Sequence, residues 1–180
     1  MNAWLIALFV AIGALGAAPG AAREQNDARS DTTVKAVFLF NFAKFTEWPS
    51  REAAGPLTLC VIGDPRVARE LADTARGQRI GDRSLVVSEI RIDGPVQSCH
   101  LLFISQSEVR KAREVLVILK RLPILTVSDN QGFARGDGII EFFIDSERMR
   151  FAVNTGAVDR AGIRLSSRLL GLARIDGRTP

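Results

Sequence analysis

The chain contains little of the side-chain chemistry on which most enzymes depend. Its 180 residues include one histidine, no tyrosine and two cysteines. A Ser-His-Asp or Cys-His site would have to use the single histidine, and a metal site needs three or four converging ligands. That histidine, His100, directly follows Cys99 at the start of an apolar segment, which is typical of a structural or solvent-facing residue. We therefore expect no catalytic residue, no metal, no cofactor and no enzymatic activity.

Signatures of phosphate and nucleic-acid binding are also missing. The sequence Gly63-Asp64-Pro65 follows an apolar segment, but neither GxGxxG nor GxxxxGK[ST] occurs in the chain. The net charge is +4, and no run of lysine and arginine exceeds two residues. Scattered basic residues of this kind are typical of a solvated surface, so we expect no nucleic-acid partner.

The first 22 residues carry no charged side chain. Within them, Trp4 to Leu15 forms a run of about twelve apolar residues, which suits a signal peptide better than a membrane span. Small residues follow, so we predict a signal peptide over residues 1–22, cleaved near Ala22, and a flexible lead-in over residues 23–30. A weak membrane anchor is the alternative, because no lysine or arginine precedes the apolar run.

The two cysteines of an exported chain predict one disulfide, between Cys60 and Cys99. Closing a loop of this length stabilises a fold by about 4 kcal/mol in the chain-entropy model. Their spacing is far from Cys-x-x-Cys, which disfavours a thioredoxin-like catalyst. The alternative is a pair of buried free thiols.

Apolar segments that alternate with amphipathic ones predict the fold of residues 31–176. The predicted strands are 57–64, 85–92 with a bulge near Ser88, 100–105 and 123–129, followed by a hairpin of 139–144 and 149–154. The predicted helices are 31–45, capped by Asp31 or Thr32, then 65–76, a helix to 122 capped by Ser105 or Ser107, 155–161 and 166–173. The pattern predicts a single three-layer α/β domain, with a mixed, mostly parallel sheet, helices on both faces and a C-terminal β-hairpin.

Aromatic side chains are concentrated in the segment from Val34 to Pro49. It holds four phenylalanines and one tryptophan, with three charged residues. Aromatic residues this dense on a helix must face a core or a partner, and both interpretations stay open.

The loop at residues 130–138 and the hairpin after it combine turn residues with apolar side chains, which suits a regulated interface. In the hairpin, Ile139, Glu141 and Phe143 share one face. An unpaired carboxylate is costly to bury, so we expect this face to lie nearer the surface, with Phe143 as an interface anchor. The candidate partner-binding residues are Phe133, Ile139, Glu141, Phe143, Phe151 and Val158.

Several motifs, taken in order, resemble one family. They are VKAVFLFNFAKFTEWP at 34–49, LTLCVIGD at 57–64, CHLLFIS at 99–105, PILTVSD at 123–129, GFARGDGIIEFF at 132–143 and RMRFAVNTGAVDRAGIRLSSRLLGLAR at 148–174. Together they resemble the YfiR family of periplasmic regulators, also called DUF4154. The family's cysteines match Cys60 and Cys99. Some relatives carry a second cysteine pair near the loop-to-hairpin region, and residues 132–144 here contain none.

The resemblance implies a periplasmic inhibitor that binds the periplasmic sensor domain of an inner-membrane diguanylate cyclase. Its release would raise cyclic di-GMP and favour biofilm growth. The family also implies a homodimer and an outer-membrane lipoprotein that sequesters the inhibitor. The alternative function is a periplasmic small-molecule sensor or binding module with a different output. A pocket at the carboxyl ends of the parallel strands, near Gly63, Asp64, Ser105 and Ser128, would favour that alternative.

Overall fold

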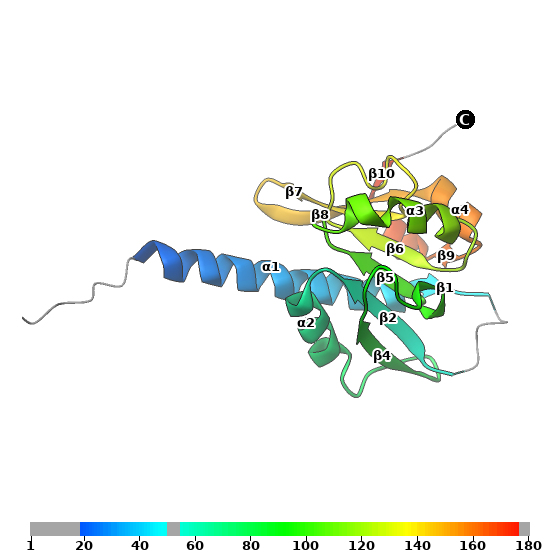
Figure 1. The fold of residues 1–180 in the computed structure, drawn as a ribbon, viewed down its shortest axis with the longest axis horizontal. Helices are drawn as coiled ribbons and strands as arrows, with labels where there is room; N and C mark the ends of the chain where they lie inside the picture. The colour runs from blue at the N-terminus through cyan, green and yellow to red at the C-terminus, as the bar shows by residue number, and fades with distance from the viewer. Residues whose placement is uncertain (1–18, 50–54, 177–180) are drawn as a thin grey trace, which may run out of the picture.

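The computed structural model describes residues 19–49 and 55–176, which form a mostly parallel sheet covered by helices (Figure 1). The strand order across the eight-stranded sheet is β10-β8-β7-β6-β5-β2-β4-β3. Its strands are β2 (Leu57–Ile62), β3 (Arg79–Ile80), β4 (Arg83–Glu89), β5 (Leu101–Ile104), β6 (Leu125–Ser128), β7 (Ile140–Asp145), β8 (Arg148–Asn154) and β10 (Arg174–Asp176). A separate antiparallel pair joins β1 (Thr46–Glu47) to β9 (Arg164–Leu165).

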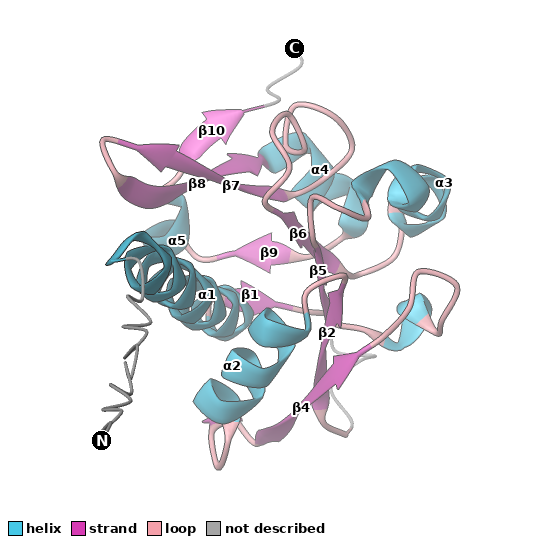
Figure 2. Ribbon diagram, turned by 60° about the vertical axis from the view of Figure 1, so that its left-hand side comes forward, coloured by secondary structure: helices cyan, strands magenta, loops and turns pink. Residues whose placement is uncertain are grey.

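The helices cover both faces of this sheet. They are α1 (Pro19–Lys44), α2 (Pro65–Ala75), α3 (Val109–Leu119), α4 (Thr155–Ala161) and α5 (Ser167–Leu170), with a short 3-10 turn, η2 (Val96–Ser98). Figure 2 shows α1 and α2 on one side of the sheet and α3 on the other. The predicted fold class, including the antiparallel β7–β8 hairpin, is confirmed.

Two apolar cores follow from the alternation of side chains along the central strands. Leu59 and Val61 of β2 join the core beneath α1 and α2, whereas Cys60 and Ile62 of the same strand join the core beneath α3. Because both faces of β2 are covered, the strand is apolar throughout apart from Thr58, as expected for a central parallel strand.

Local signals define several element ends as predicted. Asp64 caps α2 by accepting hydrogen bonds from the backbone N–H groups of Arg66 and Val67, at 3.0 and 3.3 Å, and Pro65 occupies the first turn. Asn154 caps α4 in the same way, and Gly162 ends that helix with a left-handed φ of 66°. Both helices therefore begin directly at the carboxyl end of a strand.

Other predicted boundaries are wrong. Helix α1 begins at Pro19 rather than at Asp31 or Thr32, and Asp31 pairs with Lys35 one turn later instead of capping. The predicted lead-in at 23–30 falls within the bounds of α1, whose amino-terminal half extends away from the sheet (Figure 1), and its flexibility stays a prediction. Residues 1–18 of the predicted signal peptide lie outside the described residues.

Three further differences concern strands and caps. The register of β4 with β2 is continuous through Ser88, so the predicted bulge is absent from this pair. Helix α3 is preceded by Glu108 without a side-chain cap, rather than by a serine cap, because the Ser105 carbonyl oxygen accepts the N–H of Glu108 in a tight turn. The predicted last helix ends at Leu170, and β10 follows it as a short strand parallel to β8.

No helix in the described part of the chain is both long enough and apolar enough to cross a membrane.

Candidate partner-binding site

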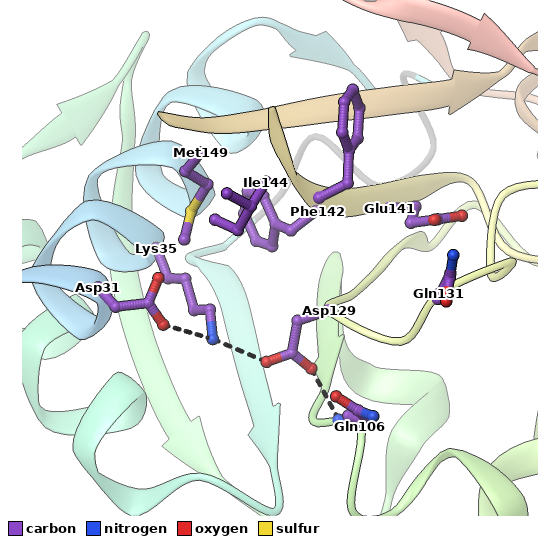
Figure 3. A pocket seen from close by; sticks show the side chains of 10 residues that line it. Asp31, Lys35, Gln106, Asp129, Gln131, Glu141, Phe142, Ile144 and Met149 are labelled. Carbon is purple, nitrogen blue, oxygen red and sulfur yellow. Dashed lines mark hydrogen bonds and ion pairs between the residues drawn. The ribbon is translucent and has the colours of Figure 1, made fainter. Parts of the chain in front are cut away.

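A pocket of about 350 Å³ lies between α1, the carboxyl end of β6 and the outer part of the β7–β8 hairpin (Figure 3). We call it the β7 pocket. Its polar lining consists of Asp31, Lys35, Gln106, Asp129, Gln131 and Glu141. Its apolar lining consists of Phe142, Phe143, Ile144 and Met149. The pocket thus combines several carboxylates with an apolar wall.

An ion-pair network forms one side of the β7 pocket. The Lys35 Nζ atom lies 3.0 Å from Asp31 Oδ2 and 2.8 Å from Asp129 Oδ2, and Asp129 Oδ1 accepts the backbone N–H of Gln106 at 2.7 Å (Figure 3). Burial lowers the pKa of Lys35, but the hydrogen bonds to Asp129 and Asp31 and the negative charges of these two groups together outweigh it, so the net pKa is raised. The network therefore ties α1 to the end of β6 through a lysine that is held in its charged form.

Glu141 forms the opposite side of the pocket, and it is almost completely buried, with 1% of its surface exposed. Its Oε2 atom accepts the backbone N–H of Ala134 at 3.1 Å. Asn154 holds the same loop in place, since its side-chain amide donates to the carbonyl oxygens of Ala134 and Gly136, at 2.8 and 3.1 Å. Our expectation that Glu141 marks an exposed face is therefore wrong. The loop donates a hydrogen bond that offsets the cost of removing the carboxylate from water.

Strand β7 extends beyond the end of its neighbour β6 at this pocket. The parallel pairing ends where Ser128 meets Glu141, whereas the antiparallel pairing with β8 continues to Asp145. Within residues 19–49 and 55–176, the stretch from Phe142 to Asp145 therefore has a strand on one side only. The β7 pocket lies along its other side.

The structure buries most of the predicted partner-binding residues. Phe133, Ile139, Glu141, Phe151 and Val158 are all buried within the single chain. Only Phe143 is half-buried, and the Arg174 guanidinium lies 4.0 Å from the centre of its ring. Their role in partner binding stays a prediction, and the single chain as described offers only Phe143 of this group at its surface.

The aromatic residues of the first helix also pack inward. Phe42 is fully buried and stacks on Phe142 at a ring-centroid distance of 5.5 Å, and it meets the edge of Phe151 at 4.9 Å. Phe38 contacts the same two hairpin rings, at 5.8 Å each. Of the two interpretations of the aromatic segment, a core explains these rings.

Sequence reasoning missed several exposed apolar side chains around the hairpin. Ile144 is 64% exposed and Leu172 is 74% exposed, and Ile175 in β10 is also exposed. The alternation of the hairpin places Ile144 on the face of Phe142, but the pattern did not show that the core ends before Ile144. The link between Lys35 and Asp129 spans 94 positions and has no sequence signal.

The predicted disulfide is present. Cys60 and Cys99 are bonded, with their Cα atoms 5.8 Å apart, and the bond joins β2 to the segment before β5. His100, next in the chain, is buried, and its Nδ1 atom accepts the backbone N–H of Thr58 at 3.1 Å. The guanidinium of Arg83 lies 2.8 Å from its Nε2 atom. These contacts fix the imidazole within the fold and indicate a structural role for His100.

The carboxyl ends of β2 and β5, where the strand order reverses, are closely packed. A Cβ atom on Gly63 would lie 2.6 Å from the Cγ of Glu108, so side chains fill the space above this turn. Ser128 is fully buried, and its hydroxyl donates to the Ile104 carbonyl oxygen at 2.7 Å. The β7 pocket lies farther along the sheet, beyond the end of β6.

A comparison with protein-family models matches residues 32–174 to the family described as YfiR/HmsC-like, DUF4154. The match runs from the second half of α1 to the start of β10, so it includes every part of the β7 pocket except Asp31. The family implies a periplasmic regulator of diguanylate cyclase-type signalling rather than an enzyme. On this evidence the chain belongs to the YfiR/HmsC-like family.

Proposed function

We propose that the protein is a periplasmic inhibitor that binds the sensor domain of an inner-membrane diguanylate cyclase and so lowers cyclic di-GMP signalling. The observation that carries this proposal is the family match over residues 32–174. Inhibition of this kind requires a surface that recognises one state of the cyclase, and it requires no bond-breaking chemistry. Ile144, Leu172 and the half-buried Phe143 supply apolar side chains for such a surface.

The proposed location is the periplasm, reached by export and cleavage near Ala22. The Cys60–Cys99 bond supports it, since disulfides form and persist in oxidising compartments. Mass spectrometry of the protein from a periplasmic extract should give a mature N-terminus near Arg23. Recovery of the uncleaved chain from the membrane fraction would reject the cleavage.

We further propose two assembly partners besides the cyclase, namely a second copy of the chain and an outer-membrane lipoprotein that sequesters the inhibitor. Family membership is the support for both. Sedimentation of the purified protein over a range of concentrations tests the homodimer, and a monomer at all of them would reject it.

The test of the main proposal is genetic. Deleting the gene should raise cyclic di-GMP only while the partner cyclase gene is present, and inhibition in vitro should saturate at a fixed ratio of the two proteins. A His100→Ala variant that remains folded should still inhibit, since the contacts of His100 are structural. A folded His100→Ala variant without inhibition would point to chemistry at the imidazole.

The β7 pocket favours a second function, a small-molecule sensor with a different output. Its volume of about 350 Å³ falls in the range of small-ligand sites. A thermal-shift screen of periplasmic metabolites tests it. A ligand that stabilises the protein, in a strain where deletion leaves cyclic di-GMP unchanged, would favour this sensor over the inhibitor.

A further inference from the structure

The unpaired edge of β7 offers backbone groups as well as side chains. Asp145 and Arg148 are paired across the two-residue turn of Ser146 and Glu147, so they form the hydrogen-bonded pair that closes the hairpin. Pairs alternate along an antiparallel ladder, so Phe143 also directs its N–H and C=O groups at β8. Ile144, between these two residues, directs its backbone groups at the opposite edge, where β6 has already ended.

This edge faces the β7 pocket instead of open solvent. Glu141, Phe142, Phe143 and Ile144 all line the pocket, and β6 points into it from its last residue, Ser128. The pocket therefore occupies the position beside β7 that further residues of β6 would take if that strand were longer. An exposed strand edge of this kind can accept one more strand from another chain.

The net negative charge of the pocket favours a basic segment as the added strand. Its lining holds three carboxylates, those of Asp31, Asp129 and Glu141, against the single ammonium group of Lys35. Lys35 already pairs with both aspartates. Arg174 lies near Glu141 but forms a bidentate pair with Asp176 outside the pocket.

The carboxylate of Glu141 places one negative charge of the pocket at a fixed position. Among the described residues, the only hydrogen bond to its carboxylate is the one that Oε2 accepts from Ala134, although the residue is 1% exposed. No completely buried side-chain oxygen or nitrogen among the described residues lacks a partner, so the second carboxylate oxygen of Glu141, a residue that lines the pocket, is not completely buried. A largely buried carboxylate with one oxygen that accepts no hydrogen bond from the described residues is suited to an ammonium or guanidinium group.

We propose that the β7 pocket binds an extended, basic segment of a partner protein, which adds to the edge of β7 as a further strand. Side chains of the added strand alternate in direction. A lysine or arginine side chain meets Glu141, and the neighbouring apolar side chains pack against Ile144 and Met149 on the other face. The identity of the partner as a cyclase rests on the proposed function, whereas the binding mode does not.

The direct test uses two synthetic peptides, acetyl-TVKVT-amide and acetyl-TVEVT-amide, titrated into isotope-labelled protein by NMR. The lysine peptide should shift the backbone amides of residues 142–145 and saturate at millimolar concentration, and the glutamate peptide should bind at least about tenfold more weakly. Equal binding of the two peptides, shifts elsewhere in the protein, or no saturable shift below about 10 mM would overturn the proposal.

A matched pair of variants tests the backbone contact. Ile144→Pro removes the edge N–H without removing a bond to β8, while Ile144→Ala removes the side chain and keeps the N–H. Ile144→Pro should weaken the lysine peptide by at least about tenfold, and Ile144→Ala should retain most of the binding. A folded Ile144→Pro variant that binds like wild type rejects strand addition.

Glu141→Gln tests whether the negative charge of Glu141 recognises the basic side chain. It also provides a test of the proposal if Ile144→Pro does not fold. The amide oxygen of glutamine can still accept the N–H of Ala134, so the loop keeps its hydrogen bond. This variant should lose the preference for the lysine peptide, whereas the control Glu147→Gln, in the exposed turn, should keep it. Unchanged preference in a folded Glu141→Gln variant overturns the assignment of the basic side chain.

The binding mode and the proposed function can fail separately. If wild type lowers cyclic di-GMP and a folded Ile144→Pro variant does so equally, strand addition by the cyclase is rejected and the inhibitor stands, while the peptide titration still decides strand addition itself. If deletion leaves cyclic di-GMP unchanged while the lysine peptide binds as described, the inhibitor is rejected and strand addition stands. A concentration-dependent dimer that masks residues 142–145 without peptide would assign this edge to a second copy of the chain and overturn the proposal.

Discussion

Two regions of the sheet differ in how completely neighbouring strands and helices cover them. Around the disulfide, β2 and β5 each have a strand on both sides and a helix layer on both faces, and their residues are almost all buried. Around the hairpin, β7 loses one neighbour halfway along, and Ile144 and Ile175 are exposed. We call these the staple region and the hairpin region. The first supplies stability, whereas the second is where backbone and apolar side chains remain available to a partner.

The largest effect should come from the core shared by the two regions. Phe42→Ala removes a fully buried ring that contacts Phe38, Phe142 and Phe151, so we expect a loss of about 3–5 kcal/mol in the free energy of unfolding. Urea denaturation measures it. Val37→Ala, on the exposed side of the same helix, is the control and should change stability by about 0.5 kcal/mol or less. A loss below about 1.5 kcal/mol for Phe42→Ala would show that α1 contributes little to the core.

Removing the staple should have the next largest effect. The double variant Cys60→Ala and Cys99→Ala eliminates the covalent link and should lower the free energy of unfolding by about 2–4 kcal/mol. Denaturation with and without a reducing agent measures it, since the reducing agent should destabilise wild type and leave the double variant unchanged. Equal stability of the oxidised and reduced wild-type protein would remove the distinction between the two regions.

Phe143 should give an intermediate effect that separates stability from recognition. Its ring is half-buried and lies under Arg174, so Phe143→Ala should cost about 1 kcal/mol of stability, far less than Phe42→Ala. Binding to the cyclase should fall by about 1–3 kcal/mol, as for an interface anchor. Titration calorimetry with the sensor domain measures the second quantity. A stability loss of about 3–5 kcal/mol would instead place Phe143 in the core.

The smallest effect concerns pH. The pKa of Lys35 is raised in the folded protein above its ordinary value of 10.5, because burial lowers it by less than the hydrogen bonds and negative charges of Asp129 and Asp31 together raise it. Its contribution to stability is therefore fully present below that value and is lost as pH rises through the higher pKa of the folded state. The stability advantage of wild type over Lys35→Met should shrink in alkaline denaturation experiments above about pH 10.5. A constant advantage across that range would show that Lys35 contributes through its packing alone.

Sequence patterns predicted the closed parts of the molecule better than the open ones. Asp64-Pro65 and the sequence from Asn154 to Gly162 carry local capping signals, and the two cysteines allow only one intramolecular pair, so the structure agrees with these predictions. Each capping signal lies within a few residues of the helix end that it specifies, and the disulfide has no competing partner. The alternation of apolar residues likewise predicted the sheet, because it reports burial directly.

The open parts depend on contacts that sequence does not display. Glu141 is buried because Ala134, seven residues earlier in a loop, supplies an N–H group, and no local pattern indicates that the loop folds over the strand. The β7 pocket exists because β6 ends at Ser128 while β7 continues to Asp145, a difference of length that only the assembled sheet reveals. Strand β10 is three residues long and its pairing with β8 was likewise invisible.

The packing of the first helix has a consequence for how the chain reaches its folded state. Phe42 completes its surroundings with Phe142 and Phe151, about a hundred residues later, and Thr46 pairs with Leu165. A chain that emerges from its amino end must therefore carry an unsatisfied aromatic helix until its last third has appeared. Contacts this distant in sequence slow folding, and exposed aromatic surface attracts other chains in the meantime. The helix that emerges first is thus among the last parts to be packed against the rest of the fold.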